Sequence, residues 1–305
     1  MHLFVEQTLN GFQLGFTLLM ISAGLTLIFG IMNIINLAHG SLFMVGAFVA
    51  AGVGARTGNY AVALLAGTAA AAVAGLVLEF VLIRRLYHRD HLDQVLATFA
   101  IVLISNEAVQ MIWGTRPASV SAPAFADRTV TVFPSLPYPV YRLAIIAAGI
   151  AAVVFLHLLV DRTRVGMWIR AGTTHRELLG AFGVNVRLLF TVVFAIGAAL
   201  AGFAGVVAAP FLSVESGVGD NFLILSFVVI VVGGIGSLKG AVYGSLALGL
   251  VDTWARTYLP DLFKNFLDAS TASTVGASVA SASIYLVMVV VLVMKPSGLF
   301  GLSDD

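Results

Sequence analysis

The polar side chains that could do chemistry are few, and one group lies inside an otherwise apolar stretch. Asn36, His39 and Ser41 follow one another between the glycines Gly30 and Gly46. Polar groups at membrane depth are costly unless they find partners, and glycine lets a helix break or two backbones approach closely. Two interpretations therefore stand side by side: the group forms hydrogen bonds that hold helices together, or it lines a path through a membrane.

Covalent and metal chemistry find little support in the sequence. The chain has no cysteine, which excludes disulfides, thiolate metal sites and cysteine nucleophiles. His39 has no acidic residue beside it, and the H-E-x-x-H and G-x-x-x-x-G-K-[ST] motifs do not occur. We therefore expect no enzyme activity, no metal, and no ATP or other cofactor bound by this chain itself.

Three acidic side chains within apolar segments need an explanation, because a carboxylate in a membrane is functional or paired. Glu79 precedes the arginines at 84–85, which predicts an ion pair near the membrane surface. Asp252 and Arg256 are four residues apart on one helix face and predict a second pair. Glu107 has no such partner, so a functional carboxylate and a hydrated structural one both remain open.

A second glycine-rich stretch, GGIGS at 233–237, is too flexible for an ordinary helix interior. It predicts a broken helix or a tight turn, with Gly234 as a further candidate for a path lining. Gly236-Ser237-Leu238 also repeats Gly40-Ser41-Leu42, and paired interruptions of this kind in two halves of a chain can indicate repeats around a central path. The alternative is a turn with glycines that serve helix packing.

The elements that must position these residues are membrane helices. Of the 305 residues, 60% are hydrophobic and 10% are charged, against about 25% charged in soluble domains. The apolar residues form runs of about 20, the length that crosses a bilayer as a helix. The net charge of +1 gives no reason to expect nucleic acid as a partner.

The sequence predicts an all-α polytopic membrane protein that forms a single domain over residues 1–305. We expect about nine membrane segments, within a range of about 8–10, because the stretches near 36–46 and 233–240 could be Gly-broken or re-entrant. The predicted segments are 9–31, 34–54, 61–83, 94–113, 141–160, 189–209, 221–236, 240–258 and 280–295.

The distribution of basic residues predicts the orientation. Ten of the sixteen fall on the side assigned to the cytoplasm and six on the other, which leaves the N-terminus outside and the C-terminus inside. The inner group is Arg84, Arg85, Arg89, Arg162, Arg164, Arg170, Arg176, Arg187, Lys239 and Lys295.

Two outer connections differ in composition. The loop at 114–140 contains five prolines, which block helix and predict an ordered, extended loop or a short hairpin. The connection at 259–279 is polar and rich in small residues, which predicts an exposed, mobile loop.

The longest inner connection, residues 161–188, predicts a short helix between two spans. Thr174 and Glu177 have the spacing of a capping box, and Gly183 fits the residue that ends a helix. A two-turn helix at 175–182 is too short to be stable alone, so it must pack on something. It either connects and covers its own spans, or it docks on a cytoplasmic partner.

Three stretches resemble one family of transporters: GLTLIFGIMNIINLAHGSLFMVGAF at 24–48, RELLGAFGVNV at 176–186, and VVGGIGSLKGAVYGSLALGLVD at 231–252, which is followed by MKPSGLFG at 294–301. In order and spacing they are similar to the branched-chain amino acid ABC permeases of the high-affinity type. Within that type, the NLAHGS stretch resembles the first of the two permease subunits.

This resemblance implies a permease of an ATP-driven importer in a bacterial inner membrane, with four kinds of partner. They are a second homologous permease, two cytoplasmic ATPase subunits that bind the ATP, an external substrate-binding protein and the lipid bilayer. With these partners, the candidates for coupling to the ATPase are Thr174, Glu177, Leu178, Leu179, Gly180 and Gly183, and the candidates for the translocation path are Asn36, His39, Ser41 and Gly234.

Three alternatives remain at this stage. Related permeases that share these motifs carry urea or short amides, so the substrate is open. A self-sufficient secondary transporter or channel would need ion or proton sites within the membrane, for which Glu107 is the main candidate. A membrane-embedded enzyme would need a clustered nucleophile and base, which the sequence does not offer.

Overall fold

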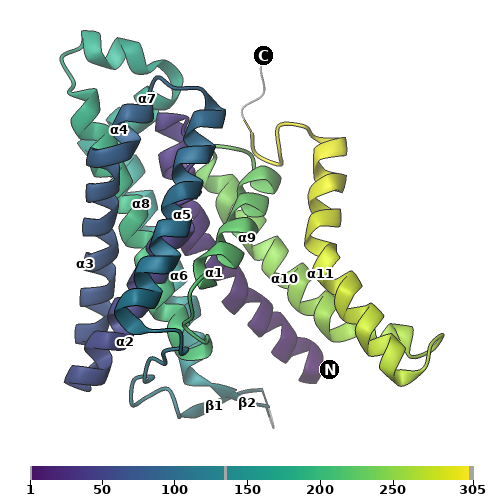
Figure 1. The fold of residues 1–305 in the computed structure, drawn as a ribbon. Helices are drawn as coiled ribbons and strands as arrows, with labels where there is room; N and C mark the ends of the chain where they lie inside the picture. Colours follow the sequence, from purple (N-terminus) through teal and green to yellow (C-terminus); the bar gives the residue numbers. More distant parts are fainter. Residues whose placement is uncertain (1, 134–135, 302–305) are drawn as a thin grey trace. The chain divides into compact units, whose positions relative to one another are not determined.

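The computed structural model describes residues 2–133 and 136–301, with the backbone alone for Phe133 and residues 173–178. The described chain is mostly helical, as the sequence predicts (Figure 1). The elements are α1 (His2–Met32), α2 (His39–Thr57), α3 (Tyr60–Leu78), a π-helical stretch (Glu79–Ile83), α4 (Arg84–Leu86), α5 (His91–Trp113), β1 (Thr129–Phe133), β2 (Leu136–Pro139), α6 (Val140–Arg162), α7 (Arg164–Ala181), α8 (Val186–Ala208), a 3₁₀ turn (Ala209–Phe211), α9 (Val218–Gly233), α10 (Leu238–Phe263) and α11 (Ala269–Met294).

Among the described residues, seven helices are long and apolar enough to cross a membrane, and the number rises to eight if a bent pair is one span. That pair is α9 and α10, which meet at an angle of 118°. The bend confirms that the glycine-rich stretch near 233–240 interrupts a helix. The predicted segments 221–236 and 240–258 are thus the two arms of this pair, so the count of about nine falls to seven or eight. The seven are His2–Met32, His39–Thr57, Tyr60–Leu86, His91–Trp113, Val140–Arg162, Val186–Phe211 and Ala269–Met294.

The chain divides into two compact units. The terminal unit comprises Met1–Leu19, Ala124–Ile150 and Ser226–Asp305, and the central unit comprises Met20–Pro123 and Ala151–Leu225.

In the central unit, α2, α3 and α8 pack with their backbones in close approach (Figure 1). A Cβ atom added at Gly46 would lie 2.6 Å from the backbone of Gly202, and one at Gly67 would lie 2.5 Å from the carbonyl oxygen of Gly46. Gly205 approaches the carbonyl of Phe43 in the same way. Small residues therefore replace a leucine-rich core here, as in membrane bundles that are held by close packing.

One end of the central unit gathers the inner basic clusters. Figure 1 shows α4 and α7 at this end, and the connection between α2 and α3 at the other. Arg84 donates a hydrogen bond of 3.0 Å to Thr191 near the start of α8, which ties the two segments together. The two arginine-rich stretches around 84–89 and 162–187 therefore share one end, as the charge distribution predicts.

The terminal unit contains the predicted hairpin. β1 and β2 pair antiparallel, with Thr129 opposite Pro139 and Val130 opposite Tyr138. The Tyr138 hydroxyl donates to Asn10 of α1 at 3.0 Å, and the Arg142 guanidinium donates to the same side-chain oxygen. The described part of the hairpin is thus anchored on a membrane helix, as expected for an extended, proline-rich loop.

The predicted pair of Asp252 and Arg256 is confirmed in α10. Arg256 Nε lies 2.9 Å from each carboxylate oxygen of Asp252. The same guanidinium also reaches α11, where Nη1 donates to the Ser281 hydroxyl at 3.3 Å. An almost buried carboxylate at this depth requires such a cation.

The expectation of a mobile loop at 259–279 is wrong. α10 continues to Phe263 and α11 begins at Ala269, so only 264–268 is non-helical. Asp268 caps α11 through a 3.0 Å bond from the Thr271 N–H. The serines and threonines that follow donate to carbonyls one turn earlier, which satisfies their hydroxyls inside a helix: Ser273 to Ala269, Thr274 to Ser270, Ser278 to Thr274 and Ser281 to Ala277.

The predicted two-turn helix at 175–182 is also too short. α7 begins at Arg164, and the Thr163 hydroxyl accepts from the Gly166 N–H at 3.0 Å, which makes Thr163 the capping residue. Thr174 therefore lies in the helix interior, and the capping-box interpretation fails. The predicted end is correct: Gly183 has a φ of 79°, and its N–H bonds the carbonyl of Gly180 at 3.1 Å.

Candidate functional site

The first membrane helix ends in an unwound segment, residues 33–38, before α2 begins. Side chains of α5 satisfy its backbone: Ile35 N–H donates to Gln94 Oε1 at 3.3 Å, and Leu37 N–H donates to Thr98 Oγ1 at 3.2 Å. Non-helical backbone at membrane depth is tolerated only where protein or a polar cavity surrounds it. Residues 33–38 connect two candidate spans and overlap the predicted interruption near 36–46 only at 36–38, because the chain is helical from His39 onward, through Gly40 and Gly46.

Three of the predicted path residues meet at this break. Asn36, His39 and Ser41 are buried, and His39 Nε2 lies 3.2 Å from the carbonyl oxygen of Ile21 on α1. Asn36 Oδ1 accepts from the Ala38 N–H at 3.1 Å. Asn36 Nδ2, His39 Nδ1 and Ser41 Oγ have no hydrogen-bond partner within the described part of the chain. These three side chains could therefore bind a polar ligand or rearrange when the segment moves.

The fourth predicted path residue, Gly234, belongs to the terminal unit. It stands in the bend between α9 and α10 with a φ of 105°, a conformation that favours glycine. The C-terminal segment pairs with the adjacent helix end, because Leu299 N–H bonds the Val232 carbonyl at 2.9 Å and Phe300 N–H bonds the Gly233 carbonyl at 2.8 Å. These two backbone hydrogen bonds thus fix the C-terminal segment against the bend.

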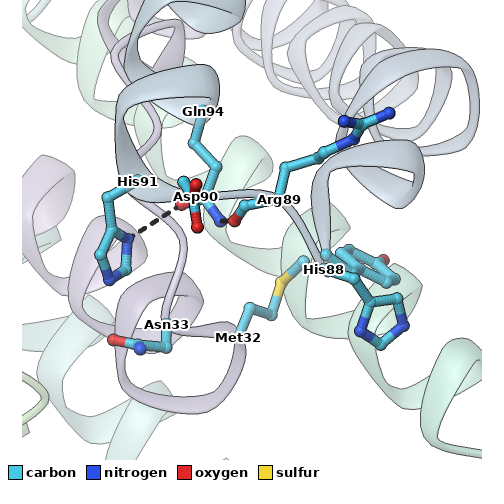
Figure 2. A pocket seen from close by; sticks show the side chains of 8 residues that line it. Met32, Asn33, His88, Arg89, Asp90, His91 and Gln94 are labelled. Carbon is cyan, nitrogen blue, oxygen red and sulfur yellow. Dashed lines mark hydrogen bonds between the residues drawn. The ribbon is translucent and has the colours of Figure 1, made fainter.

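A cavity of about 320 Å³ opens at the end of α1, next to the unwound segment (Figure 2). Gln94 is buried in its wall, where Nε2 donates to the Arg89 carbonyl at 3.0 Å and Oε1 lies 3.3 Å from His91 Nδ1. Its lining combines cationic, anionic and apolar groups: Met32, Asn33, Tyr87, His88, Arg89, Asp90, His91 and Gln94. The cavity therefore lies between the end of α1 and the connection from α4 to α5.

Glu79 lies within this same end and confirms the predicted ion pair. Its carboxylate is fully buried at the start of the π-helical stretch and accepts from Arg84 at 3.1 and 3.3 Å. Thr191 donates to it at 3.0 Å from α8, and the Tyr87 hydroxyl donates as well. Burial, followed by the bond to Glu79, raises the pKa of Tyr87. Three donors thus fix one carboxylate between α3 and α8.

α7 presents two sides with different surroundings. Leu179 is buried, and a Cβ added at Gly172 would touch it and Ile31 of α1, so this side packs on the chain itself. Gly180 has open space around it, and Phe182, just past the helix end, is 83% exposed. Of the predicted coupling residues, Leu179 is therefore inward and Gly180 outward, while Gly183 ends the turn.

The backbone of α7 includes Thr174, Glu177 and Leu178, whose side chains lie outside the described residues. Their predicted coupling role stays a prediction.

Sequence reasoning missed one polar cluster in the central unit. Asn106 Nδ2 of α5 donates to Asp220 Oδ2 of α9 at 3.2 Å, and Gln110 Nε2 donates to Ser216 Oγ at 3.2 Å. The Ser216 hydroxyl in turn donates to the Asn106 carbonyl at 3.1 Å. The sequence feature that could have indicated this cluster is Asp220, an acidic residue in the first turn of the otherwise apolar α9. Glu107, the carboxylate that the sequence singled out, is exposed instead.

Comparison with known proteins gives one consistent family. The family described as "Branched-chain amino acid transport system / permease component" matches residues 7–294. The high-affinity branched-chain amino acid transport system permease protein LivH of Escherichia coli K12 is 26% identical over 98% of this chain and 96% of its own length. BraD of Pseudomonas aeruginosa, a permease protein of the same description, has the same identity and coverage.

A third similar protein has a slightly lower identity and coverage. The probable branched-chain amino acid transport permease protein LivH of Methanocaldococcus jannaschii is 25% identical over 93% of this chain and 88% of its own length. No solved structure matches the chain. Since the match runs from the first membrane helix to the last, this multi-pass membrane protein belongs to the family of branched-chain amino acid transport system permease components.

Proposed function

We propose that this chain is a permease subunit of an ATP-driven importer that moves branched-chain or related amino acids across the inner membrane. It forms one functional permease domain over residues 1–305 and pairs with a second homologous permease. Two cytoplasmic ATPase subunits bind the ATP, and an external binding protein delivers the substrate. The names of the relatives, which describe branched-chain amino acid transport, support this proposal.

The observation that carries the proposal is the open side of α7. An exposed phenylalanine, Phe182, stands beside the open position Gly180 at the end of a helix that packs on its own chain through Gly172 and Leu179. A large apolar side chain on a polar face is typical of an anchor that fills a partner's pocket. Coupling therefore uses Gly180, Phe182 and the turn at Gly183, together with the predicted Thr174, Glu177, Leu178 and Leu179.

Transport requires a path that opens and closes. The unwound segment between α1 and α2 supports such a role, since Asn36, His39 and Ser41 hold polar atoms at membrane depth without partners among the described residues. Gly234, in the bend of α9 and α10, remains a predicted lining residue on the terminal unit.

The test is co-purification in mild detergent of the tagged chain, expressed with its neighbouring genes. Phe182→Glu should release the ATPase and retain the second permease, because a charge replaces the apolar anchor. Met167→Glu is the matched control, since Met167 is 52% exposed on the same helix and should retain both partners.

Two results would contradict the proposal. One is a chain that purifies alone as a stable oligomer. The other is leucine transport by that oligomer in liposomes without ATP, which would place the chain among secondary transporters or channels.

A further inference from the structure

The polar cluster of Asp220, Asn106, Ser216 and Gln110 is not accounted for by helix packing alone. Its donors are turned toward its own acceptors: the two amide nitrogens and the hydroxyl all donate within the cluster. Asn106 Oδ1 is enclosed and accepts from no described group. Each amide nitrogen keeps a second N–H, but the enclosed atom without a partner is an acceptor, Asn106 Oδ1, and Gln110 Oε1 and the second carboxylate oxygen of Asp220 are further acceptors.

The charge of the cluster is negative. Asp220 is half-buried, and within the described residues no basic side chain forms an ion pair with it. Glu107 and Glu215 adjoin Asn106 and Ser216 in sequence and add two exposed carboxylates. The arginine that follows α5, Arg116, forms no ion pair in the described part of the chain. A carboxylate at the edge of an apolar helix is stabilised by a cation, and none of the described basic side chains forms an ion pair with Asp220.

The cluster lies beside the unwound segment. The backbones of Gly40 and Gly219 are in contact, since a Cβ added at Gly40 would lie 2.5 Å from the Gly219 carbonyl oxygen. One turn further along each helix, the rings of Phe43 and Phe222 stack with their centroids 4.7 Å apart, which continues this contact. Asp220 therefore adjoins the start of α2, where the predicted path residues stand.

We propose that Asp220, with the side-chain oxygens of Asn106 and Gln110, binds the α-ammonium group of the transported amino acid. An ammonium carries one positive charge and three donors, which matches one carboxylate and two amide oxygens. The proposal rests on the proposed import of amino acids and adds the part of the substrate that the permease recognises. Inorganic cations also favour oxygen ligands, so the test separates the two sources.

The experiment measures the thermal unfolding of the assembled importer in nanodiscs, without the binding protein. Four probes are titrated: leucine, isopentylamine (an ammonium without a carboxylate), 4-methylpentanoate (a carboxylate without an ammonium) and sodium chloride against choline chloride. In the wild type, leucine and isopentylamine should raise the unfolding temperature, whereas 4-methylpentanoate and sodium should not.

Asp220→Asn should weaken the apparent affinity for leucine and for isopentylamine by about tenfold or more, since one charge-assisted bond is lost. Asp220→Glu, which keeps the charge, should weaken it less. Glu215→Gln is the matched control, because it removes an exposed carboxylate next to Ser216, and it should stay within about twofold of the wild type.

Different outcomes address the inference and the proposed function separately. Wild-type affinity in Asp220→Asn, or a response to sodium without a response to isopentylamine, would overturn the ammonium site while ATP-driven leucine transport still stood. Failure of the assembled wild type to transport leucine would instead overturn the proposed function. If Asp220→Asn does not fold, Gln110→Leu removes one acceptor and must weaken both ammonium probes.

Discussion

The hydroxyl of Thr191 donates a 3.0 Å hydrogen bond to the buried carboxylate of Glu79, so α8 is tied to the π-helical end of α3. Arg84 donates to both residues, and Tyr87 donates to the carboxylate. α8 follows α7 directly, which places this bond between the proposed coupling helix and the membrane bundle. A π-helical stretch often marks a functional site, and here it presents the carboxylate to α8.

Removal of the Thr191 hydroxyl should destabilise the chain. Thr191→Val keeps the shape but leaves one donor fewer for Glu79, at a cost of about 0.5–1.5 kcal/mol. Thr191→Ser should be near neutral. Thermal unfolding of the purified chain measures both, with Asp161→Asn as the control, because its bonds to His157 and Arg170 are exposed and should contribute under about 1 kcal/mol. Equal unfolding temperatures for Thr191→Val and Thr191→Ser would show that the bond is unimportant for stability.

Gly205→Ala should destabilise the central unit, because its new methyl group would meet the carbonyl of Phe43. Overpacking of this kind costs about 1–3 kcal/mol. Gly54→Ala in α2 is the matched control, since its methyl would stand 3.6 Å from Ala63 in ordinary contact. The control should be neutral, or stabilising by up to about 1 kcal/mol, because alanine favours helix over glycine. Unfolding temperatures in the same detergent give the comparison, and a neutral Gly205→Ala would refute the close approach.

Gln94→Leu should impair transport more strongly than it impairs folding. It leaves the Ile35 N–H of the unwound segment without its acceptor, which costs about 1–3 kcal/mol in a buried position. Thr98→Ser retains the hydroxyl that accepts from Leu37 N–H and should behave like the wild type. The assay is leucine uptake by the reconstituted importer, together with its unfolding temperature. Unchanged uptake in Gln94→Leu would separate the unwound segment from transport.

The start of α11 should loosen in acid. Bonds from Ser270 Oγ at 2.6 Å and from Thr271 N–H at 3.0 Å lower the pKa of Asp268 from 3.8 to about 2. A carboxyl whose pKa is lower in the folded state contributes stability above its unfolded pKa and loses it as the pH falls through the folded value. The cap should therefore weaken between about pH 4 and pH 2.

Hydrogen exchange of the first-turn amides of α11 measures this effect. Asp268→Asn keeps an acceptor at the cap but removes the charge, so its first turn should exchange without a step in this pH window. Asp261→Asn, which changes an exposed carboxylate bonded to Lys264, should retain the step. The same step in Asp268→Asn would assign the loosening to another group.

The apolar runs by themselves determined the class, most of the helices and the interruption near 233–240. Twenty apolar residues can satisfy their backbone in a bilayer only as a helix, and the glycines at 233–236 weaken it locally, whereas Gly40 and Gly46 lie inside α2. The ion pairs Glu79–Arg84 and Asp252–Arg256 were also predictable, because they are five and four residues apart on one element.

Local composition misjudged the ends of two helices. The Ser/Thr/Ala run that begins α11 looks like a loop by hydropathy, yet its hydroxyls are satisfied by carbonyls one turn earlier. α7 was placed too late because Thr174 and Glu177 mimic a cap, whereas Thr163 makes the actual bond to Gly166.

Only the tertiary structure decided which distant groups meet. Glu79 and Thr191 are 112 residues apart, and Asn106 and Asp220 are 114 apart. Periodicity along the chain carries no information about such pairs, since they form only when α3 packs on α8 and α5 packs on the start of α9. The sequence determined that these polar groups lie in a membrane, and packing determined that each has another polar group to bind.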